Sequence, residues 1–300
     1  MDKKPKIIAV VGPTSGGKTA LSIALAKKFS GEIISADSRQ IYRGMDIATG
    51  KVTEEEMGGV PHHLLDIVDP NEVYTAADFE RDAKSIIIDI LSRNNLPIIT
   101  GGTFFYIQLL LGNIQSAPVP PNQEFRDGLD QLSNDDLFTY LKASDPARAA
   151  TIDSNNRQRL IRALEIVDAL GVVPEPKKVE SPYEWLLIGT DVPKEELHTN
   201  IHLRLKQRIS NGMVDEAKRL HGEGVSFERM DQLGLEYRYL AKHLQGEITE
   251  EEMFELIETK NKQYAKRQMT WLKREETIKW YSPDNHKKIF NCLEKFLHQD

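Results

Sequence analysis

Eight residues near the start of the chain constrain its fold more than any other stretch: Gly12-Pro13-Thr14-Ser15-Gly16-Gly17-Lys18-Thr19. They fit the phosphate-binding pattern GxxxxGK[ST], for which a chance match in a chain of this length is roughly one in a hundred. An apolar run at 7–11 predicts a buried strand before the loop, and helix formers at 20–28 follow it. Because this is the context that the motif requires, we predict that the loop binds a polyphosphate, with Lys18 adding charge and Thr19 offering a hydroxyl to Mg²⁺.

Composition excludes several classes of protein. The chain has 300 residues, of which 40% are hydrophobic and 28% charged, enough for one large core and a smaller satellite. Its single cysteine, Cys292, excludes an intramolecular disulfide framework and a cysteine-rich zinc site. No apolar run is long enough to span a bilayer and the first residues lack a signal-peptide core, so we expect a cytoplasmic protein with no membrane partner. The net charge of −7 argues against bulk attraction to nucleic acid.

Strand and helix patterns alternate along much of the chain. Apolar runs at 33–36, 96–100 and 185–191 predict further strands, and the apolar period of 78–91 predicts a helix. This alternation predicts an α/β fold: a P-loop NTPase-like parallel sheet flanked by helices.

The proline-rich segment 117–121 interrupts the alternation of strands and helices, and the segments that follow it have the pattern of polar helices. We therefore expect a helical insertion domain at 116–184 within an α/β core formed by 1–115 and 185–300. The core ends in a helical C-terminal region, where apolar residues from Leu203 to Leu220 predict one long helix.

Polar residues follow the second predicted strand, at Asp37, Ser38 and Gln40. Ligands bind at the carboxyl edge of an open parallel sheet, so Asp37 would face the phosphates, although a turn-capping role is equally compatible with the pattern. Motor ATPases and GTPases usually end an apolar strand in a magnesium-orienting aspartate, whereas the strand at 96–100 ends in threonine and glycine. Asp37 is thus the best alternative carboxylate, which favours a small P-loop kinase or transferase.

Two adjacent histidines, His62 and His63, suggest a metal site at first sight. Neighbouring side chains diverge, however, and no second cluster at ligand spacing follows. The pattern favours a structural or capping pair.

The segment 260–274 holds six basic residues and no acid. At helical spacing Lys260, Tyr264, Arg267, Trp271 and Arg274 share one face, and a second face carries Ala265, Met269 and Leu272 for the core. Basic residues interleaved with aromatics suit a nucleic-acid backbone and unstacked bases, and a solvated basic helix has about equal weight on sequence alone. Arg157, Arg159 and Arg162 in the insertion form either an ion-paired face or a phosphate-reading one.

These stretches together resemble the tRNA dimethylallyltransferase family, also called tRNA isopentenyltransferases. The loop at 12–19 is similar to the family's GPT-x-x-GKT, and 35–47 is similar to its SADSxQxYRxxDI, with Arg39 where methionine is frequent. Further matches are Pro61 to Asp66, the Gly101-Gly102-Thr103 turn, and Tyr264 to Trp271. The combination covers nearly the whole chain and is weakest in the insertion.

The resemblance implies a reaction. The dimethylallyl group of dimethylallyl pyrophosphate would move to N6 of the adenosine next to the anticodon of tRNA on its 3′ side, with release of pyrophosphate. Nucleotide- and ATP-binding enzymes share the loop, and whether ATP competes with the prenyl donor is left open. Lys18 and the loop amides, with Mg²⁺ held through Thr19, would stabilise the leaving pyrophosphate, and Asp37 would accept a proton from N6.

The resemblance also implies site residues. Thr103 and Arg208 would join Asp37 and Lys18 in catalysis, with Arg208 as the counterpart of a basic residue that the family uses at the pyrophosphate. The target base would leave its stack. The anticodon stem-loop would contact Asp37, Ser38, Arg39, Gln40, Thr103, Arg126, Gln158, Arg159, Leu160, Ile161, Arg162, Lys266 and Arg267. We expect a monomer.

Three other functions compete with this one. An adenylate isopentenyltransferase would prenylate free nucleotides and needs no basic-aromatic helix. A P-loop small-molecule kinase would turn over ATP and leaves the 260–274 segment without a role. A non-catalytic RNA-binding module with a nucleotide switch does not need Asp37.

Overall fold

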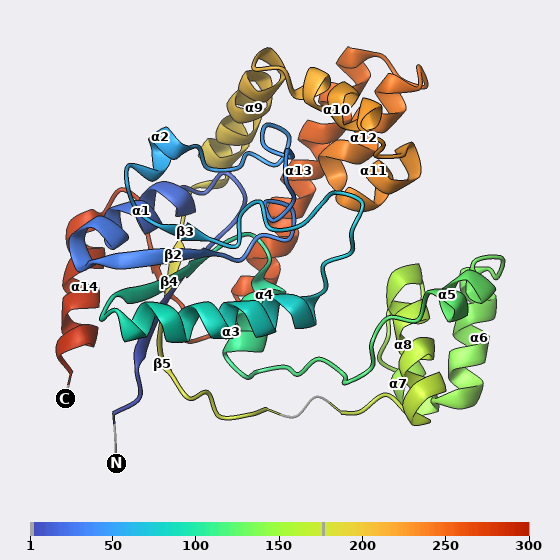
Figure 1. Ribbon diagram of the computed structural model, residues 1–300, viewed down its shortest axis with the longest axis horizontal. Coiled ribbons are helices and arrows are strands. Elements are labelled where there is room, and N and C mark those ends of the chain that lie inside the picture. The colour runs from blue at the N-terminus through green and yellow to red at the C-terminus, as the bar shows by residue number, and fades with distance from the viewer. Residues whose placement is uncertain (1–2, 176–177, 300) are drawn as a thin grey trace. The chain divides into compact units, whose positions relative to one another are not determined.

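The computed structural model describes residues 3–175 and 178–299. Its strands form a six-stranded parallel sheet with the order β3-β2-β4-β1-β5-β6, and helices flank this sheet in Figure 1. The strands are β1 (Lys6–Val11), β2 (Gly31–Ser35), β3 (His62–His63), β4 (Leu96–Thr100), β5 (Glu184–Thr190) and β6 (Lys279–Tyr281). The predicted α/β class with a parallel sheet is confirmed. The short strands β3 and β6 were not predicted, because two or three residues are too few to show a period.

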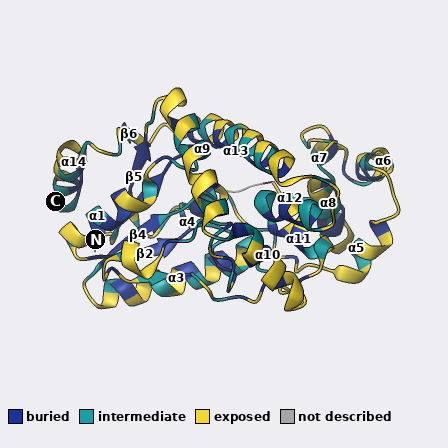
Figure 2. Cartoon of the chain, turned by 90° about the horizontal axis from the view of Figure 1, so that it is seen from above, coloured by how far each residue is buried: buried dark blue, intermediate teal, exposed yellow. Residues whose placement is uncertain are grey.

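Strand β1 is central because it pairs with both β4 and β5, so that Ile8 lies between Ile98 and Leu186. Its side chains alternate between the two faces of the sheet. On one face Ile7, Ala9 and Val11 join the buried side chains of α3 (Ala76–Ser92) and α4 (Phe104–Leu110). On the other face Ile8 and Val10 join those of α1 (Lys18–Phe29) and α14 (His286–His298). Most residues of β2, β4 and β5 are dark blue in Figure 2 because helices cover both faces of the sheet there.

The chain divides into two compact units. Unit 1 comprises Met1–Leu111 and Glu180–Asp300, and unit 2 comprises Gly112–Val179. The predicted insertion, 116–184, starts and ends a few residues later. Unit 2 packs around a core of its own that includes Leu137, Leu141 and Leu160, and its helices are α5 (Gln123–Leu129), α6 (Asn134–Ser144), α7 (Pro146–Ala149) and α8 (Arg157–Leu170).

The C-terminal part of unit 1 is helical and has its own apolar cluster, to which Met45, Met213 and Tyr237 contribute. Its helices are α9 (Lys194–Ser210), α10 (Met213–Gly222), α11 (Phe227–Leu233), α12 (Leu235–Leu244) and α13 (Glu250–Leu272), and the short α2 (Glu54–Met57) lies earlier in the chain. The prediction of one long helix from Leu203 to Leu220 was wrong. Gly212 has φ 96°, a left-handed conformation that ends the helical path between α9 and α10.

Candidate functional site

The phosphate-binding loop connects β1 to α1 and keeps the first turn of α1 free for an anion. Gly17, with φ 80°, is the N-cap, and no side chain among the described residues caps the helix. The Gly16 N–H donates to the Pro13 carbonyl at 3.1 Å, and Lys18 Nζ donates to the same oxygen at 2.7 Å. Burial lowers the pKa of Lys18 to about 8, with Asp37 opposing the shift and Arg204 adding to it. The uncapped N–H groups at the start of α1, together with the positive charge of Lys18, therefore indicate a binding site for an anion.

A cavity of ≈ 80 Å³ extends from this loop along the sheet edge. The cavity is lined by Lys18 and Thr19 of α1 and by Arg204 and Arg208 of α9, and Asp37 and Gly102 line it at the carboxyl edge of the sheet. The other lining residues are Thr14, Ser15, Ile33, Ser35, Gln40, Thr49, Gly50, Val52, His62, Leu65, Thr100 and Gly101. One cavity therefore joins the predicted phosphate site to the predicted proton acceptor. Arg204 also lines this cavity, although it was not among the site residues predicted from the sequence.

Asp37 and Thr103 follow neighbouring strands, β2 and β4, and the chain links them at short range. The Asp37 carboxylate accepts from the Arg39 N–H at 3.0 Å. Thr103 Oγ1 accepts from the Ser38 N–H at 3.1 Å, and its hydroxyl donates to Ser38 Oγ at 3.2 Å. Thr103 is not part of the cavity wall, so its direct link to the site is this hydrogen bonding with Ser38.

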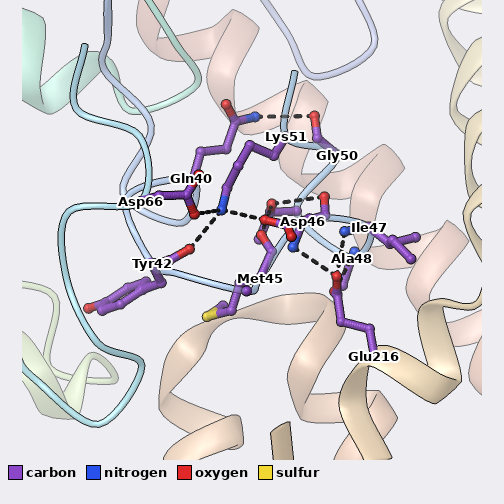
Figure 3. Close-up of polar contacts among 12 residues, drawn as sticks. Gln40, Tyr42, Met45, Asp46, Ile47, Ala48, Gly50, Lys51, Asp66 and Glu216 are labelled. Carbon is purple, nitrogen blue, oxygen red and sulfur yellow. Dashed lines mark hydrogen bonds and ion pairs between the residues drawn. The ribbon is translucent and has the colours of Figure 1, made fainter. Parts of the chain in front are cut away.

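The segment Asp46–Lys51 supplies Thr49 and Gly50 to the lining of the cavity and is held by a buried carboxylate (Figure 3). Glu216 of α10 accepts from the N–H groups of Asp46, Ile47 and Ala48 at 2.8, 2.7 and 3.0 Å, and from the Tyr237 hydroxyl at 2.7 Å.

Two cavity residues hold the same segment from the inside. Arg208 donates to the Ala48 carbonyl at 3.2 Å, and Gln40 donates to the Gly50 carbonyl at 3.3 Å. Lys51 extends the network by donating to the Tyr42 carbonyl at 2.8 Å. Gln40 and Arg208, both predicted from the sequence, thus line the cavity and hold this segment. Glu216 was missed because the backbone groups that it binds lie about 170 residues away in the chain.

Gln268 of α13 is a second missed residue. Its Oε1 accepts from the Thr14 N–H at 2.8 Å, and its Nε2 donates to the Gly102 carbonyl at 2.9 Å. A Cβ on Gly102 would lie 3.2 Å from Gln268 Nε2 and 3.5 Å from the Asp37 carboxylate. Gln268 therefore bridges the phosphate-binding loop and the turn beside Asp37. Its position within the matching stretch Tyr264 to Trp271 was the available signal.

The two adjacent histidines differ in their surroundings, and only His62 is among the residues that line the cavity. His63 Nε2 lies 2.7 Å from the Glu32 carboxylate, and His62 Nδ1 donates to the Val60 carbonyl at 2.9 Å. His62 Nε2 is buried without a partner among the described residues, and burial lowers the pKa of this imidazole. The described residues contain no group of three or more His, Cys, Asp or Glu that could hold a metal ion.

A magnesium ion at this site would be held by oxygen atoms of Thr19, Asp37 and a bound phosphate, and not by a cluster of protein side chains. Thr19 lies exposed beside Lys18, its hydroxyl has no partner in the described part of the chain, and Asp37 is the carboxylate that lines the cavity. Mg²⁺ commonly keeps several waters and binds through one or two carboxylates or hydroxyls together with substrate phosphates. These residues fit a magnesium ion carried in with a pyrophosphate and do not fit a cage made by protein alone.

Unit 2 holds the predicted residues of α5 and α8 around another buried carboxylate. Arg126 forms two hydrogen bonds of 2.9 Å to Glu165, and Arg162 pairs with the same carboxylate. Burial alone would raise the pKa of Glu165, but these partners and the Asn122 N–H hold it near 2. The Leu160 side chain is fully buried, so it supports α8 from the core of the unit.

The remaining predicted residues of unit 2 have different surroundings. Gln158 and Arg159 are exposed and line a pocket of ≈ 250 Å³ together with Arg162, while Ile161 packs partly against the core of the unit. Arg157 donates to the carbonyls of Leu129, Asp130 and Leu132 and so closes the end of α5. Its role is structural, and Arg159 is the exposed cation of the predicted trio.

The basic segment lies on the last turns of α13 and the residues that follow. Lys266, Arg267, Lys273 and Arg274 are exposed, and the Arg267 guanidinium lies over the Tyr264 ring at 5.9 Å from its centroid. Lys262 is instead paired with Glu258 at 2.5 Å. On the inner face Ala265 and Leu272 are buried and Met269 is partly buried, as their spacing predicted.

No helix in the described part of the chain is both long and apolar enough to cross a membrane.

Comparisons with known proteins give the family. Residues 40–275 match the family model described as IPP transferase. A tRNA dimethylallyltransferase of Oceanobacillus iheyensis is 38% identical, over 93% of this chain and 91% of that protein, and one of Thermomicrobium roseum is 39% identical, over 100% and 94%. The crystal structure of a tRNA isopentenylpyrophosphate transferase from Bacillus halodurans aligns with a TM-score of 0.73 at 36% identity, covering 98% of this chain and 96% of that one. A eukaryotic dimethylallyltransferase acting on tRNA aligns with a TM-score of 0.82 at 25% identity, covering 98% of this chain and 79% of that one. The chain therefore belongs to the IPP transferase family.

Proposed function

We propose that this protein is a tRNA dimethylallyltransferase. It transfers the dimethylallyl group of dimethylallyl pyrophosphate to N6 of the adenosine next to the anticodon on its 3′ side, and pyrophosphate leaves. The observation that carries this proposal is the single cavity that holds Lys18 of the phosphate-binding loop and Asp37 at the sheet edge, in a chain of the IPP transferase family. A donor with a pyrophosphate and an acceptor with an exchangeable proton need these two groups together.

The roles follow from the charge changes of the reaction. The bond between C1 of the donor and its bridging oxygen breaks, and the pyrophosphate keeps the electron pair. Lys18, the amides of the loop and Arg208 stabilise this growing charge, with Arg204 as a further cation at the cavity wall. Mg²⁺ held through Thr19 and the pyrophosphate would supply additional charge neutralisation.

The acceptor nitrogen forms the new bond to C1 and loses one proton. Asp37 accepts that proton, and Thr103 positions the backbone beside it through Ser38. A base in a stacked loop cannot reach a cavity of this kind, so the target adenosine leaves its stack first. Exposed residues on both units, among them Arg159 and Arg267, hold the anticodon stem-loop.

We propose that the protein acts as a monomer whose site is formed within unit 1, to which every residue that lines the cavity belongs. We propose that the reaction takes place in the cytoplasm. Sedimentation of the protein with and without tRNA tests whether the protein is a monomer. A monomer should sediment as a single chain, and its complex should contain one chain for each bound tRNA.

The deciding experiment uses the whole chain with tRNA, dimethylallyl pyrophosphate and Mg²⁺, followed by digestion and mass analysis of the nucleosides. We expect one C5H8 unit to be added to a single adenosine. Parallel incubations with AMP and with ATP address the competing functions. Prenylated AMP with unmodified tRNA would indicate an adenylate isopentenyltransferase, and phosphoryl transfer from ATP without prenylation would indicate a kinase.

A further inference from the structure

Three aromatic side chains are exposed in the described part of unit 1, and they lie along one edge. Phe105 is 39% exposed, Tyr264 37% and Trp271 42%, whereas the other described Phe, Tyr and Trp residues of that unit are partly or fully buried. We call these three side chains the aromatic ledge. Exposed aromatic surface costs free energy in water, so three such rings gathered at one place suggest a partner.

The ledge starts at the acceptor side of the cavity. The Tyr264 hydroxyl lies 3.4 Å from the Gly102 carbonyl, and Phe105 comes two residues after Thr103. Trp271 is two turns beyond Tyr264 on α13, and its ring centroid lies 6.5 Å from that of Phe105. The helices that carry these rings, α4 and α13, lie side by side in Figure 1, and an edge-to-face packing of Phe104 on Trp271 joins them.

The charges around the ledge identify the kind of partner. Lys266, Arg267, Lys273 and Arg274 are exposed next to the rings, in a chain whose net charge is −7. An apolar protein partner would gain nothing from four cations. Unpaired nucleotides offer both a flat base for a ring and a phosphate for a cation.

We propose that the aromatic ledge stacks an unpaired base of the anticodon loop that flanks the target adenosine. This inference rests on the proposed function. When the target base leaves the loop stack, its neighbours lose a stacking surface, and the rings of Phe105 and Trp271 replace that surface. The neighbouring cations hold the phosphates of the same nucleotides.

Stacking and charge neutralisation differ in their response to salt. Removal of a cation that neutralises one phosphate flattens the slope of log K against log salt concentration by roughly 0.7–0.9, whereas removal of a stacked ring lowers affinity at every salt concentration by the same factor. Binding of an anticodon stem-loop, measured by fluorescence anisotropy across a salt series, therefore separates the two. We compare Phe105→Ala, Trp271→Ala and Trp271→Phe with Lys266→Ala.

We expect Phe105→Ala and Trp271→Ala each to weaken binding roughly 5- to 100-fold with an unchanged slope, and Trp271→Phe to restore most of the affinity. Lys266→Ala should flatten the slope. A stem-loop with abasic sites beside the target adenosine should bind the wild-type protein less tightly than the intact stem-loop does. Its affinity should not fall further when Trp271→Ala replaces the wild-type protein. Thermal melts check that each variant is folded. If loss of the Trp271 ring destabilises α13, Phe105→Ala tests the proposal in place of Trp271→Ala.

Wild-type affinity in both alanine variants, or an equal loss in Trp271→Phe, overturns the proposal, as does a slope change like that of Lys266→Ala. The same stem-loop is also tested for prenylation by the wild-type protein. Absence of that product would overturn the proposed function, whereas prenylation with no effect of the ledge variants would overturn only the ledge.

Discussion

Gln268 accepts a hydrogen bond from the backbone N–H of Thr14 at 2.8 Å, although the two residues are 254 positions apart. The same amide donates to the Gly102 carbonyl, so a single side chain fixes the phosphate-binding loop against the turn beside Asp37. Only one orientation of the amide satisfies both bonds, because Thr14 supplies a donor and Gly102 an acceptor. The distance between the phosphate-binding loop and the turn beside Asp37 thus depends on α13.

Replacing Gln268 by Met preserves its volume and removes both bonds. We expect the single-turnover rate at saturating donor and tRNA to fall about 10²-fold, because misplacing the reactants by about 1 Å costs that much. The matched control is Leu272→Ala, which removes a buried side chain one turn further along the same helix. It should lower stability more than Gln268→Met and leave the rate unchanged. Equal rates in wild type and Gln268→Met would show that the bridge is not needed for positioning.

Asp37→Ala should abolish transfer and leave donor binding largely intact. Loss of a positioned base typically costs ~10²–10⁴-fold in rate. Rapid-quench measurement of transfer, with donor affinity measured separately by titration, checks both parts. Turnover close to that of the wild type would rule out Asp37 as the proton acceptor.

Lys18→Ala should weaken the complex with dimethylallyl pyrophosphate and also slow the chemical step. The ammonium lies at the cavity wall, where it meets charge that is present in the donor and grows as the C–O bond breaks. Single-turnover rates at saturating donor separate the two effects. If those rates match the wild type, Lys18 assists binding alone.

The six cations of the 260–274 segment should differ from one another in their effect on tRNA binding. Removing Lys260, Lys266, Arg267, Lys273 or Arg274 singly should flatten the log–log salt slope by roughly 0.7–0.9 for each phosphate that is no longer neutralised, with little effect on the donor. Lys262 should contribute less, because it is already paired with Glu258.

Polar substitutions of Ala265 and Leu272 should instead lower stability. Salt slopes unchanged in all six cation variants would leave Arg159 and its neighbours in unit 2 as the main binding surface for tRNA.

Glu165 should make the stability of unit 2 depend on pH in the acid range. Its pKa is near 2 in the folded protein and 4.5 in the unfolded chain, so its contribution is complete above about 4.5 and is lost as the pH falls toward 2. A shift of this size corresponds to about 3 kcal/mol. Glu165→Gln should remove this acid dependence in urea unfolding followed by circular dichroism. Asp168→Asn, an exposed neighbour on α8, is the control and should retain it.

The amino-acid sequence by itself determined the parts of this protein that depend on neighbours in the chain. The phosphate-binding loop with its strand and helix, the alternation that makes a parallel sheet, and the polar residues after β2 are local patterns, and the structure has them. The same reasoning failed at Asn211 and Gly212, because the apolar period continues across the turn between α9 and α10 while a single left-handed glycine ends the helix.

Only the tertiary structure decided how the site is assembled. Gln268 reaches Thr14, Glu216 reaches the segment Asp46–Lys51, and Arg204 comes to stand near Lys18 because the strand order β3-β2-β4-β1-β5-β6 and the packing of α9, α10 and α13 bring distant segments together. No periodicity encodes such pairings, since their partners lie about 170 to 250 positions away. Their energies arise from buried hydrogen bonds and charges that exist only once the chain has folded.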